Sequence, residues 1–223
     1  MPRRAAVTLI VLAAVLAPLA GCKTAQMRGE KPWEFACPAA GTAVSYDDGR
    51  RLTFTGPDPA DANVCLARTE AGAQVRLIWG LVEDTASEGR GHRPAMAPLF
   101  PAKTGSNVGY TADLSSPGSG IQYRFDTRWR LVGYETIEVP AGRFSTLVFE
   151  RSVQGTGANA GQSFKLTYYV EGGSGVVLKR TVELGRGGST LMRPFQAVKF
   201  SRPPPPPPRP EPQPAGPAGP PRS

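Results

Sequence analysis

A length of 223 residues suits one domain, or a domain with a small preceding unit, and the formal charge of +8 makes the chain basic. A basic chain is compatible with nucleic-acid binding, but the sequence has no RNA-binding or DNA-binding motif. It also lacks Gly-x-Ser-x-Gly, Ser-x-x-Lys, a phosphate loop and metal-ligand spacing. We therefore expect a protein that is not an enzyme and has no catalytic residue, metal site or cofactor.

The N-terminus has the layout of a secretory signal. Arg3 and Arg4 precede an apolar run from Ala5 to Ala20, and small residues then lead into Cys22. The stretch Leu19-Ala20-Gly21-Cys22 resembles the lipobox of bacterial lipoproteins. This resemblance implies that residues 1–21 are a signal peptide that is removed, and that Cys22 then carries the lipid on its sulfur and an acyl chain on its new amino terminus.

Two alternatives to lipidation are an uncleaved membrane anchor and a soluble secreted protein. The apolar run is interrupted by Thr8 and Pro18 and is shorter than the roughly 20 residues that a spanning helix needs, which argues against the anchor. Several acyl chains would hold the protein at a membrane where one chain would not. We expect a domain that faces the periplasm and is tethered to the envelope by lipid.

Residues 22–32 are short and polar and are interpreted as the tether. In enterobacterial lipoproteins, an aspartate directly after the lipidated cysteine retains the protein at the inner membrane. Lys23 occupies that position here. The resemblance therefore implies the outer membrane rather than the inner one.

Cys37 and Cys65 remain after Cys22 is assigned to lipid. The periplasm is oxidising, so an even number of remaining cysteines predicts a disulfide. Closing a loop of about 29 residues would stabilise the fold by roughly 3 to 4 kcal/mol on the loop-entropy model. The alternatives are two buried thiols, or metal ligands that would need His92 and several carboxylates in addition.

Residues 33–201 are predicted to form one β-rich domain, which begins with a hairpin unit over 33–83. The turn residues Asp47-Asp48-Gly49 separate predicted strands over 43–46 and 51–55. A further strand over 75–82 is expected to bury its odd-numbered positions, because apolar residues fill them.

Residues 84–120 are rich in Gly, Pro and Ser and are predicted to be a long loop. It would be either a functional lid or a partly mobile segment packed on its apolar island at 96–100. His92 lies in this loop and is expected to be exposed, where a histidine is more often inert than catalytic.

The main sheet is predicted over residues 121–201, where alternation is clearest. Aromatic and apolar side chains alternate with polar ones along 122–131, so one face should be buried and the arginines should lie in solvent or meet phosphates. Gly133 is expected to allow a bend or bulge. The buried positions are predicted to be Tyr123, Phe125, Thr127, Trp129 and Leu131.

Regularly spaced strands with almost no helical periodicity predict a mainly β fold. The expected architecture is an antiparallel curved sheet that forms a half-barrel, barrel or sandwich, preceded by the signal helix. Residues 202–223 contain half of the 24 prolines and are predicted to be a disordered tail. This tail would be a spacer, a ligand for an aromatic-lined groove or a probe into the cell wall.

The stretch Gly133-Tyr134-Glu135-Thr136-Ile137-Glu138-Val139-Pro140-Ala141-Gly142-Arg143-Phe144 resembles a hairpin of uncharacterised bacterial envelope proteins. Their curved antiparallel sheet is similar to that of lipoprotein carriers and receptors. The Tyr168-Tyr169 strand and Gly175-Val176-Val177 extend the resemblance over about residues 121–185. It implies the fold and assigns no functional residue.

Three classes of function follow from these features. The first is a non-enzymatic binding module for a lipid or an envelope protein partner, which an open apolar concavity would support. The second is a structural or assembly lipoprotein that contacts cell wall or proteins through its surface and proline tail, which exposed apolar patches would favour. The third, an enzyme, has no motif in its support.

Overall fold

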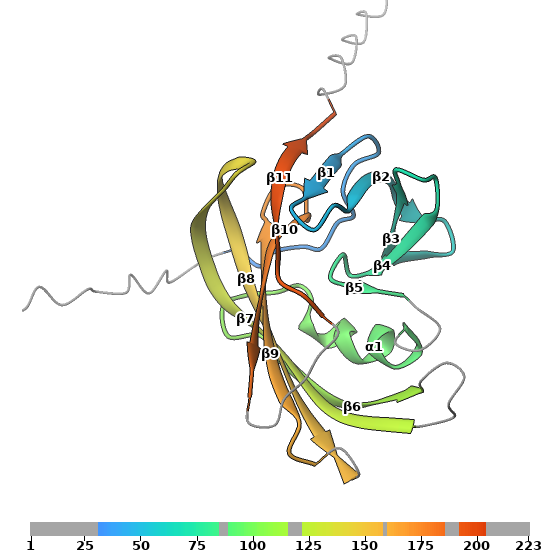
Figure 1. Ribbon diagram of the computed structural model, residues 1–223, viewed down its shortest axis with the longest axis vertical. Helices are drawn as coiled ribbons and strands as arrows, with labels where there is room; N and C mark the ends of the chain where they lie inside the picture. The colour runs from blue at the N-terminus through green and yellow to red at the C-terminus, as the bar shows by residue number, and fades with distance from the viewer. Residues whose placement is uncertain (1–30, 85–88, 116–121, 158–159, 186–191, 204–223) are drawn as a thin grey trace, which may run out of the picture. The chain divides into compact units, whose positions relative to one another are not determined.

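The computed structural model describes residues 31–84, 89–115, 122–157, 160–185 and 192–203. Within these ranges, eleven strands pair in one antiparallel sheet (Figure 1). One short α-helix, followed directly by a 3-10 turn, connects the fifth strand to the sixth. The first five strands are β1 Ala43–Tyr46, β2 Arg51–Asp58, β3 Asp61–Thr69, β4 Gln74–Ile78 and β5 Val82–Glu83. The helices are α1 Gly89–Met96 and the 3-10 turn η1 Ala97–Leu99. The remaining strands are β6 Asn107–Ser115, β7 Gln122–Val139, β8 Gly142–Thr156, β9 Ser163–Glu171, β10 Val177–Leu184 and β11 Phe195–Ser201.

The strand order is β5-β4-β3-β2-β1-β11-β10-β9-β8-β7-β6, so every neighbour is sequential except the pair β1 and β11. This confirms the predicted mainly β fold with an antiparallel sheet. Among the described residues, β5 and β6 are the two ends of the sheet and do not pair, so the sheet is not closed into a barrel. The predicted signal helix and the tail beyond Pro203 lie outside the described residues.

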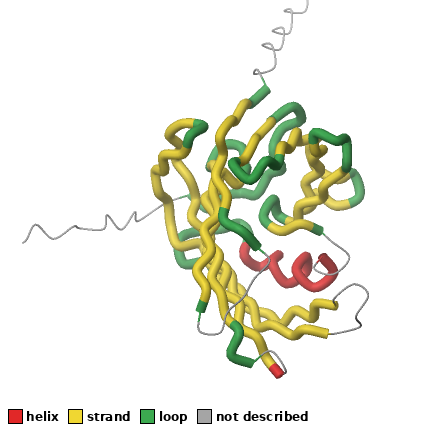
Figure 2. Tube along the Cα trace, viewed as in Figure 1, coloured by secondary structure: helices red, strands yellow, loops and turns green. Residues whose placement is uncertain are grey.

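The predicted long loop over 84–120 is wrong in its central part. The structure forms α1, η1 and β6 there, and α1 lies between the β5 end and the β6 end of the sheet (Figures 1 and 2). The loop interpretation relied on Gly and Pro content. The apolar island is packed as one alternative had it, since Met96 and Leu99 are fully buried, but the interpretation missed the helix and the pairing of β6 with β7 over nine residues. None of the described helices has the length and apolar character needed to cross a bilayer.

The strand predicted over 75–82 ends early, at Ile78. Trp79 adopts a left-handed backbone with φ of 51°, which costs about 1 to 2 kcal/mol for a residue with a side chain. Its ring stacks on Phe100 at 4.3 Å between centroids, and its Nε1 donates to the Arg93 carbonyl at 3.5 Å. These contacts hold a turn that sequence alternation could not indicate, and Ile78 is buried instead of exposed.

The alternation predicted for β7 is confirmed where side chains are described. Thr127, Trp129 and Leu131 are buried, Phe125 is half-buried, and the intervening Arg128 and Arg130 are exposed. The side chain of Tyr123 lies outside the described part. The register of β7 against β8 shifts between Leu131 and Gly133, so the predicted bulge is present.

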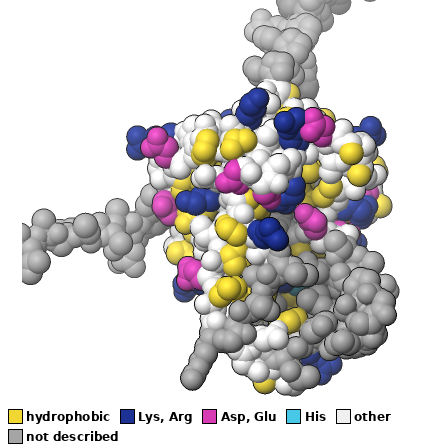
Figure 3. Space-filling model, in the orientation of Figure 1, with side chains coloured by type: hydrophobic (Ala, Val, Ile, Leu, Met, Phe, Trp, Pro, Cys, Tyr) yellow, Lys and Arg dark blue, Asp and Glu magenta, His cyan; other side chains and the backbone are white. Residues whose placement is uncertain are grey.

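The inner face of the sheet, defined by Trp129 and the residues in phase with it, carries the core. An aromatic cluster fills the space between this face and the segments before β1 and after α1. Its members are Trp33, Phe35, Trp79, Phe100 and Phe149, with ring centroids 4.3 to 6.1 Å apart. On the surface seen in Figure 3, basic and acidic side chains are interspersed.

Candidate functional site

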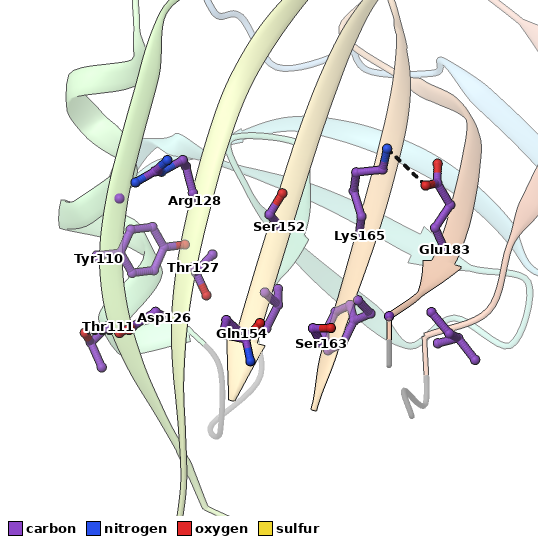
Figure 4. A pocket seen from close by; sticks show the side chains of 15 residues that line it. Tyr110, Thr111, Asp126, Thr127, Arg128, Ser152, Gln154, Ser163, Lys165 and Glu183 are labelled. Atoms are coloured by element: carbon purple, nitrogen blue, oxygen red, sulfur yellow. Dashed lines mark hydrogen bonds and ion pairs between the residues drawn. The ribbon is translucent and has the colours of Figure 1, made fainter. Parts of the chain in front are cut away.

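The outer face of the sheet, opposite Trp129, contains a depression of about 840 Å³ that crosses β6 to β10 (Figure 4). We call it the outer groove. A volume of this size lies within the range typical of ligand sites. The polar side chains that line it are Thr111, Asp126, Arg128, Ser152, Gln154, Ser163, Lys165 and Glu183, and Tyr110, Thr127, Val153, Phe164, Leu184 and the glycines 109 and 185 complete it.

Strand register places the lining side chains in two parallel rows. One row runs across the strands as Gly109, Arg128, Ser152, Lys165 and Glu183. The neighbouring row, two residues along each strand, runs as Thr111, Asp126, Gln154 and Ser163. Neighbouring strands lie about 4.8 Å apart, so five strands give the groove a length of roughly 19 Å.

Side-chain size explains why a hollow forms on this part of the sheet. Gly109 and Ser152 alternate with the long Arg128 and Lys165 along the first row. An ion pair occupies the next row of the outer face on each side of the groove. The two pairs are Arg130 with Glu150 at 2.6 Å and Arg124 with Asp113 at 2.8 Å.

Charges inside the groove balance. Lys165 Nζ lies 3.0 Å from Glu183 and 3.8 Å from Glu150, and the hydrogen bond to Glu183 raises the pKa of Lys165. Asp126 accepts a hydrogen bond from Thr111 Oγ1 at 2.7 Å. With Arg128 added, the lining carries two basic and two acidic side chains.

Several polar side chains in the groove have no partner of their own. Within the described ranges, no hydrogen bond or ion pair engages the side chains of Arg128, Ser152 or Gln154. These three side chains lie on adjacent strands and offer guanidinium, hydroxyl and amide groups. A neutral lining with mixed donors and acceptors suits a ligand rich in hydroxyl or amide groups.

The sequence-predicted site residues lie away from the groove or outside the described part. Cys22, the predicted lipidation site, lies outside the described residues. The Sγ atoms of Cys37 and Cys65 lie 2.14 Å apart, with Cα atoms 5.3 Å apart, so the structure places the pair at disulfide distance. Cys65 belongs to β3, whereas β6 to β10 form the groove.

His92 is buried rather than exposed, contrary to the sequence prediction. It lies on α1, its Nδ1 contacts the Tyr110 hydroxyl, and its Nε2 lies 3.5 Å from Arg151 Nη2. Burial, assisted by the charge of Arg151, lowers the pKa of His92 to about 3, so the imidazole is neutral. The prediction failed because glycine-rich surroundings suggested a loop instead of a helix packed on the sheet.

Sequence reasoning placed Arg128 on an exposed basic face but did not find the groove. The polar positions of β7, β8 and β9 are visible in the sequence as alternate residues. Their assembly into rows depends on strand register, which the Gly133 bulge shifts by one residue. No single-strand pattern carries that information.

Among solved structures, the chain is similar to the hypothetical lipoprotein YmcC from Escherichia coli K12. The two are 17% identical with a TM-score of 0.42, over 74% of this chain and 84% of that chain. This distant likeness assigns no residue a role. No protein-family model matches the sequence. No curated protein matches it.

Proposed function

We propose that this chain is a lipid-anchored protein of the bacterial cell envelope and acts there as a non-enzymatic binding module. The lipobox-like Leu19-Ala20-Gly21-Cys22 supports the anchor, and Lys23 supports the outer membrane with the domain facing the periplasm. A folded β domain that follows a short tether is the part available for binding.

The ligand that the domain suits best is an extended, uncharged and polar polymer of the envelope, of the class of cell-wall glycan strands. The observation that carries this is the outer groove, about 840 Å³ in volume, with unpartnered polar side chains at Arg128, Ser152 and Gln154. A strongly anionic polymer would favour an excess of basic residues. Here Glu183 and Asp126 balance the two basic side chains.

An apolar lipid, the ligand expected from the sequence, has less support. Its place would be the concave inner face, and the aromatic cluster, which includes Phe149 and Trp33, occupies that face. Phe149 is fully buried.

Sedimentation with purified peptidoglycan tests the groove. The acylated full-length protein in detergent micelles is mixed with sacculi and the pelleted fraction is measured. Ser152→Lys places a long side chain in the middle of the groove, so we expect binding at least tenfold weaker than wild type. Ser145→Lys is the matched control, because Ser145 is an exposed serine of the same strand outside the groove. Equal binding by both variants would overturn the glycan assignment.

Metabolic labelling with a fatty acid tests the anchor independently of the groove. Cys22→Ala should leave an unprocessed precursor without label, because no other nucleophile in the lipobox can take the lipid. Continued labelling of the alanine variant would remove the lipobox assignment.

One observation favours the structural or assembly role as a second candidate. Val132 is the extra residue of the β7 bulge and Tyr134 lies two residues further on, and they are 42% and 39% exposed, which is unusual for large apolar side chains in this domain. Cross-linking at this site in intact cells tests the role. If Val132→Asp abolishes recovery of a cross-linked protein and leaves peptidoglycan sedimentation unchanged, the bulge contacts a protein partner. Unchanged cross-linking would exclude that contact.

A further inference from the structure

A buried arginine lies on the inner face, on the side of the sheet opposite the outer groove. Arg151 is 2% exposed and is placed in β8 opposite Trp129 of β7 and Leu166 of β9. Its guanidinium lies 5.6 Å from the Trp129 ring centroid. Within the part of the chain that the structure describes, no carboxylate pairs with it. A guanidinium removed from water without a counter-charge is costly.

Most of the hydrogen-bonding capacity of Arg151 is unused. A guanidinium has five N–H donors, and the 3.5 Å approach of Nη2 to Nε2 of His92 engages one. Nε and Nη1 are buried and have no hydrogen-bond partner among the described residues. The His92 ring accepts from Arg151 as a neutral base, because burial and the Arg151 charge both oppose its protonation and lower its pKa to about 3. It therefore contributes no negative charge.

A second unpartnered polar group lies beside Arg151. Thr127 is 2% exposed, and its Oγ1 is buried without a partner among the described residues. Thr127 pairs with Val153, which lies two residues beyond Arg151 on the same face. Diagonal neighbours of this kind have Cβ atoms about 7 Å apart, close enough for both side chains to contact one small ligand.

Neutral polar side chains of β6, β7 and α1 lie beside this pair. Trp129 Nε1 donates to the Tyr110 hydroxyl at 3.1 Å, and that hydroxyl contacts His92 of α1. Tyr110 and Thr127 are also among the residues around the outer groove, but strand register puts their side chains in phase with Trp129 on the inner face, so one layer of sheet separates the two regions. The described polar groups beside the Arg151 guanidinium are the neutral side chains of His92, Tyr110 and Thr127.

We propose that Arg151 and Thr127 form an internal binding site for a small oxyanion of the phosphate class, located where α1 meets the sheet. The anion neutralises the guanidinium and accepts hydrogen bonds from the Arg151 N–H groups and from Thr127 Oγ1. Arginine suits such anions because its planar fork matches their oxygen geometry. The source is either free phosphate or the phosphate headgroup of an envelope lipid. Arg151 is not among the residues that line the outer groove, so a variant of Arg151 tests this site separately from glycan binding.

Thermal unfolding of the full-length protein in uncharged detergent tests the site. Inorganic phosphate is titrated against chloride at constant ionic strength, and phosphatidylglycerol in mixed micelles forms a second arm. We expect a saturable rise in Tm of about 5 to 10 °C, the size typical of a ligand at a hundred times its Kd on a domain of this length. A rise with phosphate identifies free anion as sufficient, and a rise with phosphatidylglycerol alone identifies the lipid headgroup.

Matched variants assign the effect to the site. Arg151→Met should abolish the rise, whereas Arg143→Met should retain it, because Arg143 is an exposed arginine of the same strand. Thr127→Val keeps shape and fold and should shift the midpoint of the titration to at least fivefold higher phosphate, so the site stays testable if Arg151→Met does not fold. No saturable rise in either arm, or an equal rise in Thr127→Val and wild type, would overturn the proposal.

Discussion

The same residue types, arginine and small hydroxyl residues, are exposed on one face of β7 and β8 and buried on the other. Arg128 and Ser152 face solvent on the outer side, where water satisfies them and a ligand can replace that water. Arg151 and Thr127 lie at neighbouring positions on the inner side, and both are 2% exposed. A polar group is inexpensive on one face and costly on the other, because only burial removes its hydration.

This difference shows which polar residues demand an explanation. The outer arginines need none for stability, since a solvated charge is the ordinary state of a sheet face. The inner guanidinium approaches one hydrogen-bonding group among the described residues, which is His92, and it lies over the Trp129 ring. The experiments below therefore compare inner with outer positions, beginning with the largest expected change in the free energy of unfolding.

Trp129→Ala should give the largest loss. Trp129 is fully buried, packs against Tyr168 at 5.2 Å between ring centroids and donates to Tyr110. Removing the indole leaves a cavity, so we expect a loss of about 3 to 5 kcal/mol. Urea unfolding measures it. A loss below about 1 kcal/mol would mean that the inner face is not the core.

His92 should make the inner face sensitive to acid. The unfolded chain binds a proton on this histidine near its ordinary pKa of 6.5, whereas the folded chain holds the pKa at about 3 because of burial and Arg151. Between these values only the unfolded state is protonated, so stability falls as the pH drops from about 6.5 toward 3.

The size of this effect is measured against a variant without the imidazole. Between pH 7 and pH 5, wild type should lose up to about 2 kcal/mol more than His92→Gln, from one-proton linkage. Urea unfolding over that pH range measures the difference. Parallel stability curves for the two proteins would show that His92 titrates normally in the folded state.

Local periodicity was sufficient for much of the sheet. The alternation of Trp129 with Arg128 and Arg130 predicts which side of β7 is buried, and the structure confirms it. The turn at Asp47-Asp48-Gly49 also lies between β1 and β2 as expected. These features depend on residues that are neighbours in the chain, so a single sequence contains them.

The sequence predictions that were wrong, and the outer groove that was not predicted, concern features that depend on residues distant in the chain. The α1 segment has little apolar periodicity, and its place becomes clear only because Met96 and His92 are buried against other elements. Trp79 leaves the β conformation because Phe100, far along the chain, stacks on its ring. The groove similarly needs the register of five strands.

The Lys165–Glu183 pair should contribute modestly, because it is on the outer face. The two groups lie 3.0 Å apart, and their side chains are 36% and 62% exposed. A double-mutant cycle with Lys165→Met and Glu183→Gln should give a coupling of about 0.2 to 1 kcal/mol that weakens in high salt. A larger coupling that salt does not change would indicate that the two side chains are less accessible to water than their exposed fractions of 36% and 62% imply.

Arg128→Ala should cause the smallest change in stability, although Arg128 is next to Trp129 in sequence. Its side chain is exposed and has no hydrogen bond or ion pair among the described residues, so its removal should alter the free energy of unfolding by no more than about 0.5 kcal/mol. Peptidoglycan sedimentation should nevertheless weaken, because the guanidinium is one of the unpartnered donors of the outer groove. Arg143→Ala, at an exposed position outside the groove, should leave both measurements unchanged.

If Arg128→Ala destabilises the protein as much as Trp129→Ala, the two faces of β7 are not distinct. If it leaves both stability and sedimentation unchanged, Arg128 is an ordinary solvated side chain and plays no part in glycan binding.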